Sequence, residues 1–200
     1  MNTQAYVILL HGFLRTSKSM KKIEKVLTKE GFEVINLDYP SRKEKIENLA
    51  TNHLKKIIEE KCTDQTRKIH FVTHSMGGII VRYFLANNKL KNLGRVVMMA
   101  PPNKGSKYAD FISKFAIANK ILGPALEQLK TDIQSLPRRI PHLQYEAGII
   151  AGKYDQKVPA KYAQLDSMTD FLLVPSTHTF IMYTNQVTRA IVKFLKAGKF

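Results

Sequence analysis

The sequence lacks several features that define special classes of protein. It has a single cysteine, Cys62, which excludes an intrachain disulfide, and no CxxC motif of the kind found in redox enzymes and zinc sites. Its longest apolar runs, such as residues 96–100, are far shorter than the roughly 20 residues that a membrane-spanning helix needs. The apolar stretch 5–10 is too short for a secretory signal, and no basic residue precedes it. We therefore expect a cytoplasmic protein, for which peripheral membrane association stays open.

Acidic residues are few relative to basic ones. The 16 Asp and Glu residues stand against 32 Lys and Arg residues, which gives a formal net charge of +16. Such an excess attracts polyanions and anionic membrane surfaces. The densest basic group shares one helix face, which is either a solvated surface or a contact for anionic lipid or an acidic substrate; it comprises Lys18, Lys21, Lys22, Lys25 and Lys29. Because no nucleic-acid-binding motif accompanies the charge, we expect no nucleic acid partner.

Short apolar runs alternate with amphipathic helical segments along the 200 residues. The runs predict strands at residues 6–10, 32–37, 69–73, 96–100, 148–151 and 171–174. Strands that alternate with helices form right-handed βαβ units, so we predict an α/β protein with about six mostly parallel strands and helices on both faces. Ligands of such sheets bind beyond the carboxyl ends of the strands. The residues that directly follow the strands are therefore the candidates for function.

One connection, residues 101–146 between the fourth and fifth strands, is much longer than the others. Its apolar residues recur at helical spacings, which predicts a helical cap insertion at about residues 103–145 within a single domain of residues 1–200. Tyr108, Phe111 and Phe115 follow an i, i+3, i+7 spacing, so they are candidates for a pocket that holds an acyl chain. The alternatives are that these helices simply cover the sheet and that the aromatic residues fill the core.

A serine directly after the third predicted strand has the surroundings of a nucleophile. The segment THSMGG at residues 73–78 fits the strand–turn–helix motif G-x-S-x-G, with Thr73 in place of the first glycine. Such a turn projects the serine hydroxyl at the edge of the sheet, and the helix N-terminus behind it favours developing negative charge. Two adjacent glycines are unfavourable for a helix start, which indicates that the tight turn is needed. We predict that Ser75 is a nucleophile; the alternative is a surface serine that caps a helix.

Three further strand ends supply the groups that such a nucleophile requires. The segment HGF at residues 11–13 follows the first strand, so the backbone N–H of Phe13 and that of Met76 are predicted to form an oxyanion hole. A serine nucleophile needs a base, and the base needs an orienting acid. Asp155 follows the fifth strand and His178 the sixth, in the chain order Ser, Asp, His typical of this motif. We predict Asp155 as the acid and His178 as the base.

The remaining histidines and two rival acids occupy less suitable positions. The histidines are His11, expected to hold its loop, His53 on an apolar helical stripe as a core or packing residue, His70 inside a strand, His74 beside the nucleophile, and His142 in the cap. The rival acids, Asp166 and Asp170, precede the sixth strand instead of following the fifth.

At these residues the sequence resembles the α/β-hydrolase family, and within it the small lipase-like and esterase-like serine hydrolases. The matching segments are LHGF at 10–13, THSMGG at 73–78, APPNKGS at 100–106, GKYD at 152–155 and TH at 177–178. The resemblance implies the α/β-hydrolase fold in a minimal form, since the first apolar run leads directly to the His-Gly loop. It also implies acyl transfer by a catalytic triad, with no metal and no other cofactor.

The resemblance is specific to the fold and the catalytic groups, and not to one substrate. It implies hydrolysis of a carboxylic ester, of a small molecule or a lipid, through an acyl-enzyme on Ser75. An acyltransferase or a thioesterase would use the same triad, and a non-catalytic module that binds lipids or anions would use only the fold.

Overall fold

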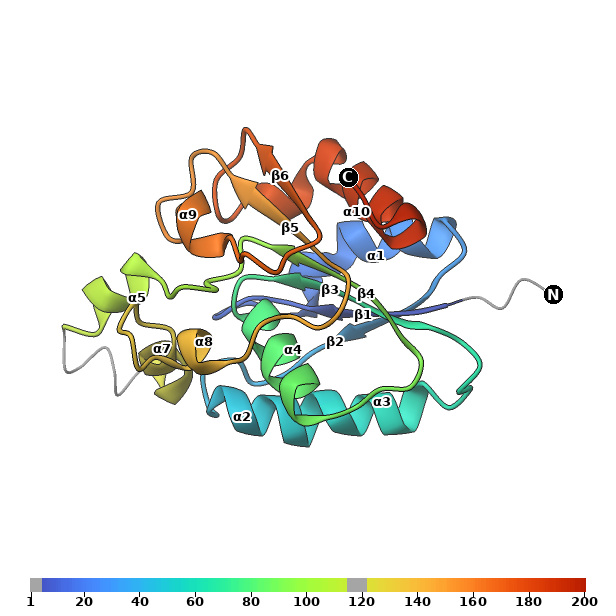
Figure 1. Ribbon diagram of the computed structural model, residues 1–200, viewed down its shortest axis with the longest axis horizontal. Helices are drawn as coiled ribbons and strands as arrows, with labels where there is room; N and C mark the ends of the chain where they lie inside the picture. The colour runs from blue at the N-terminus through green and yellow to red at the C-terminus, as the bar shows by residue number, and fades with distance from the viewer. Residues whose placement is uncertain (1–4, 115–121) are drawn as a thin grey trace.

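Six parallel strands form one sheet in the part of the chain that the computed structural model describes, residues 5–114 and 122–200 (Figure 1). The strands are β1 (Tyr6–Leu10), β2 (Glu33–Leu37), β3 (Ile69–His74), β4 (Leu93–Met99), β5 (Ala147–Gly152) and β6 (Asp170–Val174). Their order across the sheet is β2-β1-β3-β4-β5-β6, and each neighbouring pair is parallel. The prediction of about six mostly parallel strands is confirmed. Because all the strands run the same way, their carboxyl ends lie at one edge of the sheet.

Helices cover both faces of the sheet. Those in the described ranges are η1 (Ser17–Met20), α1 (Lys21–Lys29), α2 (Ile46–Asn48), η2 (Leu49–Lys55), α3 (Lys56–Lys61), α4 (Met76–Asn87), α5 (Lys107–Ile112), α7 (Pro124–Gln128), α8 (Leu136–Arg139), α9 (Ala160–Ala163), η3 (Ile181–Tyr183) and α10 (Asn185–Ala197). Figure 1 shows α1 and α10 on one face and α2, α3 and α4 on the other. Within residues 5–114 and 122–200, every helix is too short or too polar to cross a membrane.

Strand β1 shows why the strands read as unbroken apolar runs in the sequence. All 5 of its residues are buried. Val7 and Leu9 belong to the core that α1 and α10 cover, whereas Ile8 and Leu10 belong to the core on the opposite face. Successive side chains of a strand point to opposite faces, so a strand covered on both sides needs an apolar residue at every position.

The helical segment after β2 differs from the regular helix that its periodicity predicts. It consists of α2, the π-helical stretch η2 and α3 in direct succession. The wider π-helical turn shifts side chains around the helix axis. Leu49, Ala50 and Leu54 are buried, whereas the side chain of His53 is 29% exposed and its Nε2 lies 2.9 Å from Oε1 of Glu44. His53 is therefore a partly exposed histidine that packs beside a carboxylate, and not a core residue.

The connection between β4 and β5, residues 101–146, is referred to below as the insert. It carries the short helices α5, α7 and α8, which lie beyond the carboxyl ends of the strands at the left of Figure 1. Ala109, Leu126 and Leu129 of the insert are buried and belong to the same core as Ile8 and Leu10 of β1. These buried residues of the insert are therefore part of the core on that face of the sheet.

Candidate active site

Ser75 lies at the sharp turn between β3 and α4. Its backbone has φ 51° and ψ −123°, a conformation that non-glycine residues rarely adopt. The Ser75 N–H donates to the carbonyl of Met99 (2.8 Å), and the Gly78 N–H donates to the carbonyl of Ser75 (2.9 Å). A Cβ at position 77 would lie 2.7 Å from the carbonyl oxygen of Leu10. Gly77 therefore lets α4 pass directly beside the end of β1.

Thr73 stands where the motif has a glycine, and a neighbouring glycine makes room for it. The Thr73 side chain is buried, and its hydroxyl donates to the carbonyl of Val97 on β4 at 3.5 Å. A Cβ at Gly78 would lie only 3.3 Å from Thr73 Oγ1. The second glycine of the GG pair thus accommodates the larger residue without opening the turn.

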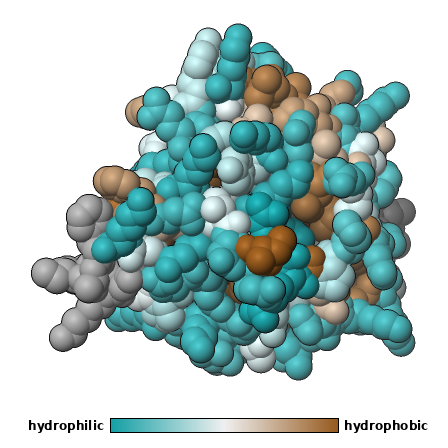
Figure 2. All heavy atoms as spheres, turned by 60° about the vertical axis from the view of Figure 1, so that its left-hand side comes forward, coloured by the Kyte–Doolittle hydropathy of each residue, from teal (hydrophilic) through white to brown (hydrophobic). Residues whose placement is uncertain are grey.

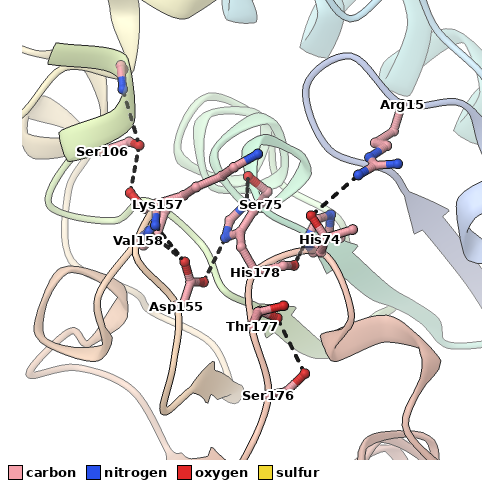
Figure 3. A network of polar contacts seen from close by, with 12 residues as sticks. Arg15, His74, Ser75, Ser106, Asp155, Lys157, Val158, Ser176, Thr177 and His178 are labelled. Carbon is pink, nitrogen blue, oxygen red and sulfur yellow. Dashed lines mark hydrogen bonds and ion pairs between the residues drawn. The ribbon is translucent and has the colours of Figure 1, made fainter. Parts of the chain in front are cut away.

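His178, in the loop after β6, contacts both Ser75 and Asp155 (Figure 3). The Ser75 hydroxyl donates to Nε2 of His178 at 3.0 Å, and Nδ1–H of His178 donates to Oδ2 of Asp155 at 2.7 Å. This pair of bonds places the ring proton on Nδ1 and leaves Nε2 free to accept one, which is the form that a general base requires. The structure therefore brings the three predicted residues together from the ends of β3, β5 and β6.

Asp155 is held in place by backbone donors. Its Oδ1 accepts the N–H groups of Lys157 (2.9 Å) and Val158 (2.8 Å), and its side chain is 0% exposed. A buried carboxylate is tolerated when its oxygens are hydrogen-bonded in this way. The two backbone bonds fix the direction of the other oxygen, Oδ2, toward His178.

The rival acids lie in other surroundings. The Asp170 side chain accepts the N–H groups of Phe171 (2.8 Å) and Phe200 (2.7 Å), and Asp166 is exposed. No three His, Cys, Asp or Glu side chains in residues 5–114 and 122–200 lie close enough together to hold a metal ion.

The loop after β1 lies against the nucleophile. A Cβ at Gly12 would lie 3.1 Å from Cβ of Ser75 and 2.8 Å from Nδ1 of His74, so this backbone approach requires glycine. Within the described part of the chain, the next N–H, that of Phe13, has no hydrogen-bond partner. The N–H of Met76 begins α4, where helix amides have no acceptor in their own helix. Both amides are therefore candidate donors to an oxygen atom beside Ser75.

Two further histidines support the site. The Nε2–H of His74 donates to the carbonyl of His178 at 2.9 Å, which ties the loop after β6 to the end of β3. Burial, and then the charge of a protonated His178, lowers the pKa of His74 well below its usual value, so His74 stays neutral. His11 stacks on Tyr39 with ring centroids 4.0 Å apart, and its Nδ1–H donates to the carbonyl of Gly12 at 2.9 Å. The only sequence signal for the role of His74 is its position beside Ser75.

A cleft of about 270 Å³ opens over Ser75 and His178. The insert contributes one wall, formed by Pro102, Ser106, Tyr108, Ala109, Leu126 and Leu129. Of the three aromatic residues predicted for a pocket, Tyr108 lines this cleft, Phe111 does not line it and is 57% exposed, and Phe115 lies outside the described residues. Hydrophilic side chains cover most of this face of the molecule, and apolar ones form separate groups (Figure 2).

Sequence reasoning missed two charged residues of the cleft, Arg15 and Lys157. Each follows a predicted site residue by two positions, Arg15 after Phe13 and Lys157 after Asp155. A basic residue close behind a predicted site residue in a strand-end loop is therefore the signal that could have found them.

Known proteins resemble the chain in both sequence and structure. The family described as serine aminopeptidase, S33, matches residues 1–190. Triacylglycerol lipase 2 of Saccharomyces cerevisiae is 26% identical in a match 121 residues long. The match covers 54% of this chain but only 37% of that protein, so the chain spans well under half of this curated relative.

Solved structures share the fold over nearly the whole chain. A mature lipase of Bacillus licheniformis superposes with a TM-score of 0.74 at 18% identity, covering 100% of this chain and 94% of the other. A thermophilic esterase of Thermogutta terrifontis gives 0.70 at 19% identity, covering 98% and 91%. A monoacylglycerol lipase of Paleococcus ferrophilus gives 0.70 at 16% identity, covering 96% and 94%. The fold is thus that of the α/β-hydrolases, and the chain belongs to the serine aminopeptidase S33 family.

Proposed function

We propose that this protein is a serine hydrolase that cleaves carboxylic esters through an acyl-enzyme on Ser75. The observation that carries the proposal is the pair of hydrogen bonds that links Ser75 to His178 and His178 to Asp155 at the floor of an open cleft. A serine hydroxyl is a weak nucleophile until a base takes its proton. This arrangement supplies the base and the acid that orients it.

In the first half of the reaction the Ser75 hydroxyl oxygen attacks the ester carbonyl carbon. Nε2 of His178 takes the hydroxyl proton, and the carboxylate of Asp155 stabilises the imidazolium that forms. The carbonyl oxygen becomes an oxyanion, to which the N–H groups of Phe13 and Met76 donate. The positive end of the α4 dipole acts in the same direction.

In the second half the acyl-enzyme is hydrolysed. The C–O bond of the tetrahedral intermediate breaks, and His178 gives its proton to the departing alcohol. His178 then accepts a proton from water, whose oxygen attacks the acyl carbon. The bond between that carbon and Oγ of Ser75 breaks, His178 returns the proton to Oγ, and the acid is released. An alcohol acceptor in place of water would make the protein an acyltransferase, and a thiol leaving group would make it a thioesterase. Product analysis with added acceptors and thioesters separates these reactions.

The cleft favours an ester of modest size. Its volume of about 270 Å³ is close to the lower end of the roughly 300–1,000 Å³ typical of small-molecule sites. Leu126, Leu129 and Val158 supply apolar surface for an acyl group. The insert, which forms one wall, would act as the predicted cap of a single domain, and the lysines of α1 would support contact with an anionic membrane when the ester is a lipid.

The charge of the cleft disfavours the aminopeptidase activity that the family description names. An aminopeptidase must bind the positively charged amino group of its substrate, for which carboxylates are the usual partners. Among the described residues, those that line the cleft include no Asp or Glu, and they include the cations Arg15 and Lys157. Ester cleavage makes no such demand.

The test replaces the nucleophile. We expect Ser75→Ala to lower kcat on p-nitrophenyl esters by roughly 10,000-fold or more, to abolish labelling by a fluorophosphonate, and to leave the unfolding transition in place. Ser17→Ala, at a partly exposed serine outside the cleft, is the matched control and should hydrolyse and label like the wild type. Retained turnover in a folded Ser75→Ala protein would remove the proposal.

A further inference from the structure

The described residues that line the cleft over Ser75 carry two positive side chains and no negative one. Of the described residues that line it, Arg15 and Lys157 are the only Arg, Lys, Asp or Glu residues. Figure 3 shows them on opposite sides of the Ser75 and His178 pair, with the amino end of Lys157 directed across the site. A substrate placed over Ser75 therefore lies between two cations.

A turn holds Arg15 beside the site. The Arg15 N–H donates to the carbonyl of Gly12 at 3.2 Å, and the preceding residue, Leu14, has φ 57° and donates its N–H to Oγ of Ser41 at 3.1 Å. The guanidinium donates to Oγ1 of Thr179 at 3.4 Å, in the loop that carries the catalytic histidine. Arg15 is thus bonded both within its own loop after β1 and to the loop after β6.

Lys157 is fixed from the other side. Its N–H donates to Oδ1 of Asp155, and its carbonyl accepts the hydroxyl of Ser106 at 2.9 Å. Its Nζ lies 4.7 Å from the centre of the Tyr108 ring, so the ammonium extends over an aromatic face at the cleft wall. Lys157 is partly buried, which weakens the screening of its charge by water.

Neither cation is neutralised by an acidic partner among the described residues. Other basic residues of the molecule pair with acids, as Arg95 does with Glu146 and Arg67 with Glu33. Arg15 and Lys157 form no ion pair with any residue in ranges 5–114 and 122–200. Two unpaired cations at a cleft of low volume produce a positive potential where the substrate binds.

We infer that the cleft selects esters that carry an anionic group, a carboxylate or a phosphate, close to the bond that is cleaved. Arg15 and Lys157 are the residues that bind this anionic group. The inference rests on the proposed ester hydrolysis and names its substrate class. Arg presents a planar fork suited to carboxylate and phosphate oxygens, and Lys supplies a mobile point charge. The apolar residues Leu126, Leu129 and Val158 would contact the uncharged part of the substrate.

The experiment uses pairs of esters that differ in one charge. The first pair is p-nitrophenyl hexanoate and the p-nitrophenyl monoester of adipic acid, whose six-carbon acyl chain ends in a carboxylate. The second pair, 4-acetoxybenzamide and 4-acetoxybenzoate, places the charge on the leaving group. Each kcat/KM is divided by the rate of alkaline hydrolysis of the same ester, and we expect the anionic member of at least one pair to be favoured roughly tenfold at low salt.

Variants assign the preference to its residues. Arg15→Gln and Lys157→Gln should each reduce the ratio of the normalised kcat/KM values of the anionic and the neutral ester, mainly through KM. The double variant should bring this ratio close to one. The double variant Arg15→Lys, Lys157→Arg keeps both charges and should retain most of the preference. Lys25→Gln removes the same charge from the exposed face of α1 and should leave the ratio at the wild-type value.

The outcomes separate the inference from the function on which it rests. Hydrolysis of the neutral esters without preference for either anion overturns the inference and leaves the proposed function standing. A preference that survives in the folded Gln double variant overturns the assignment to Arg15 and Lys157. Failure to hydrolyse any of the four esters overturns both proposals.

Discussion

The strand-end loops and the insert contribute differently to the site. The loops after β1, β3, β5 and β6 carry Ser75, Asp155 and His178 as well as the two candidate oxyanion donors. The backbones of these loops are held by hydrogen bonds to neighbouring strands and loops. The insert contributes only cleft walls, from residues such as Tyr108 and Leu126. In the proposed reaction the sheet provides the chemistry, and the insert, with the two cations, provides the choice of substrate.

The difference has a physical origin. The four strands belong to one parallel sheet and end at the same edge, so residues more than 100 positions apart in the chain, such as Ser75 and His178, meet without a long support of their own. The described residues of the insert include no strand to fix it, and short helices must hold it by packing and by side-chain bonds. Changes to the catalytic groups at the strand ends should therefore affect turnover of all substrates alike, whereas changes in the insert should affect stability and substrate binding.

The largest effect among the following changes is expected on the sheet side, at Asp155. Asp155→Asn keeps the size of the side chain but removes the charge that stabilises the imidazolium of His178. We expect kcat to fall roughly 1,000- to 10,000-fold on every ester, with little change in KM. Steady-state kinetics on the neutral and anionic pairs measures this.

A matched control is Asp166→Asn, at the exposed rival acid, which should keep wild-type kcat. If Asp166→Asn lowers kcat and Asp155→Asn does not, the assignment of the acid is reversed. A loss at Asp155 confined to one substrate would contradict the assignment of chemistry to the strand ends.

The sequence predicts the strand ends well because their requirements are local. A strand covered on both faces needs unbroken apolar residues, and the turn at Ser75 needs Gly77 and Gly78, so both can be recognised from short segments. The predicted strands agree with the observed ones to within a few residues. The positions of Asp155 and His178 follow from the strand ends and the chain order.

The sequence predicts the insert poorly because its contacts are distant. Nothing in the local pattern shows that Tyr108 lines the cleft while Phe111 points to solvent, since both follow the same helical spacing. The π-helical stretch η2 cannot be predicted from the sequence either, because its apolar periodicity also fits a regular helix. Arg15 and Lys157 are 2 of 32 basic residues, and only their positions close behind predicted site residues distinguish them in the sequence.

The second prediction concerns Arg82, which joins α4 to the insert. Its buried guanidinium donates to Oδ1 of Asn103 (3.0 Å) and to the carbonyls of Pro137 (3.2 Å) and Ile140 (3.3 Å). Arg82→Met would leave these acceptors without a donor, so we expect the free energy of unfolding to fall by about 2–3 kcal/mol. The residue touches no substrate, so kcat should change far less than in Asp155→Asn.

Urea unfolding and limited proteolysis measure this effect. We expect new cleavage sites within the insert, and Arg189→Met, at an exposed arginine of α10, to behave as the wild type. If the insert of Arg82→Met is protected from proteolysis as well as that of the wild type, packing alone holds the insert and the side-chain bonds of Arg82 are not needed.

The smallest effect lies within the sheet, at His70 on β3, away from the cleft. Burial, and then the charge of Arg95, lowers the pKa of His70 to about 4, and its Nδ1 accepts the Arg95 N–H at 2.7 Å. In the unfolded chain this histidine titrates near 6.5. Below that pH the unfolded chain binds a proton that the folded protein does not, so stability present above pH 6.5 is lost as the pH falls toward 4.

His70→Asn removes this titration, and the Asn side-chain oxygen can still accept the Arg95 N–H. Between pH 7.5 and pH 5 we expect the wild type to lose about 2 kcal/mol more of its unfolding free energy than His70→Asn does. His142→Asn, at an exposed histidine of the insert, should follow the wild-type pH dependence. Urea titrations at the two pH values decide the point: a wild-type slope in His70→Asn would mean that the acid sensitivity arises elsewhere, with the buried His74 beside the cleft as the next residue to replace, because its pKa is lowered in the same direction.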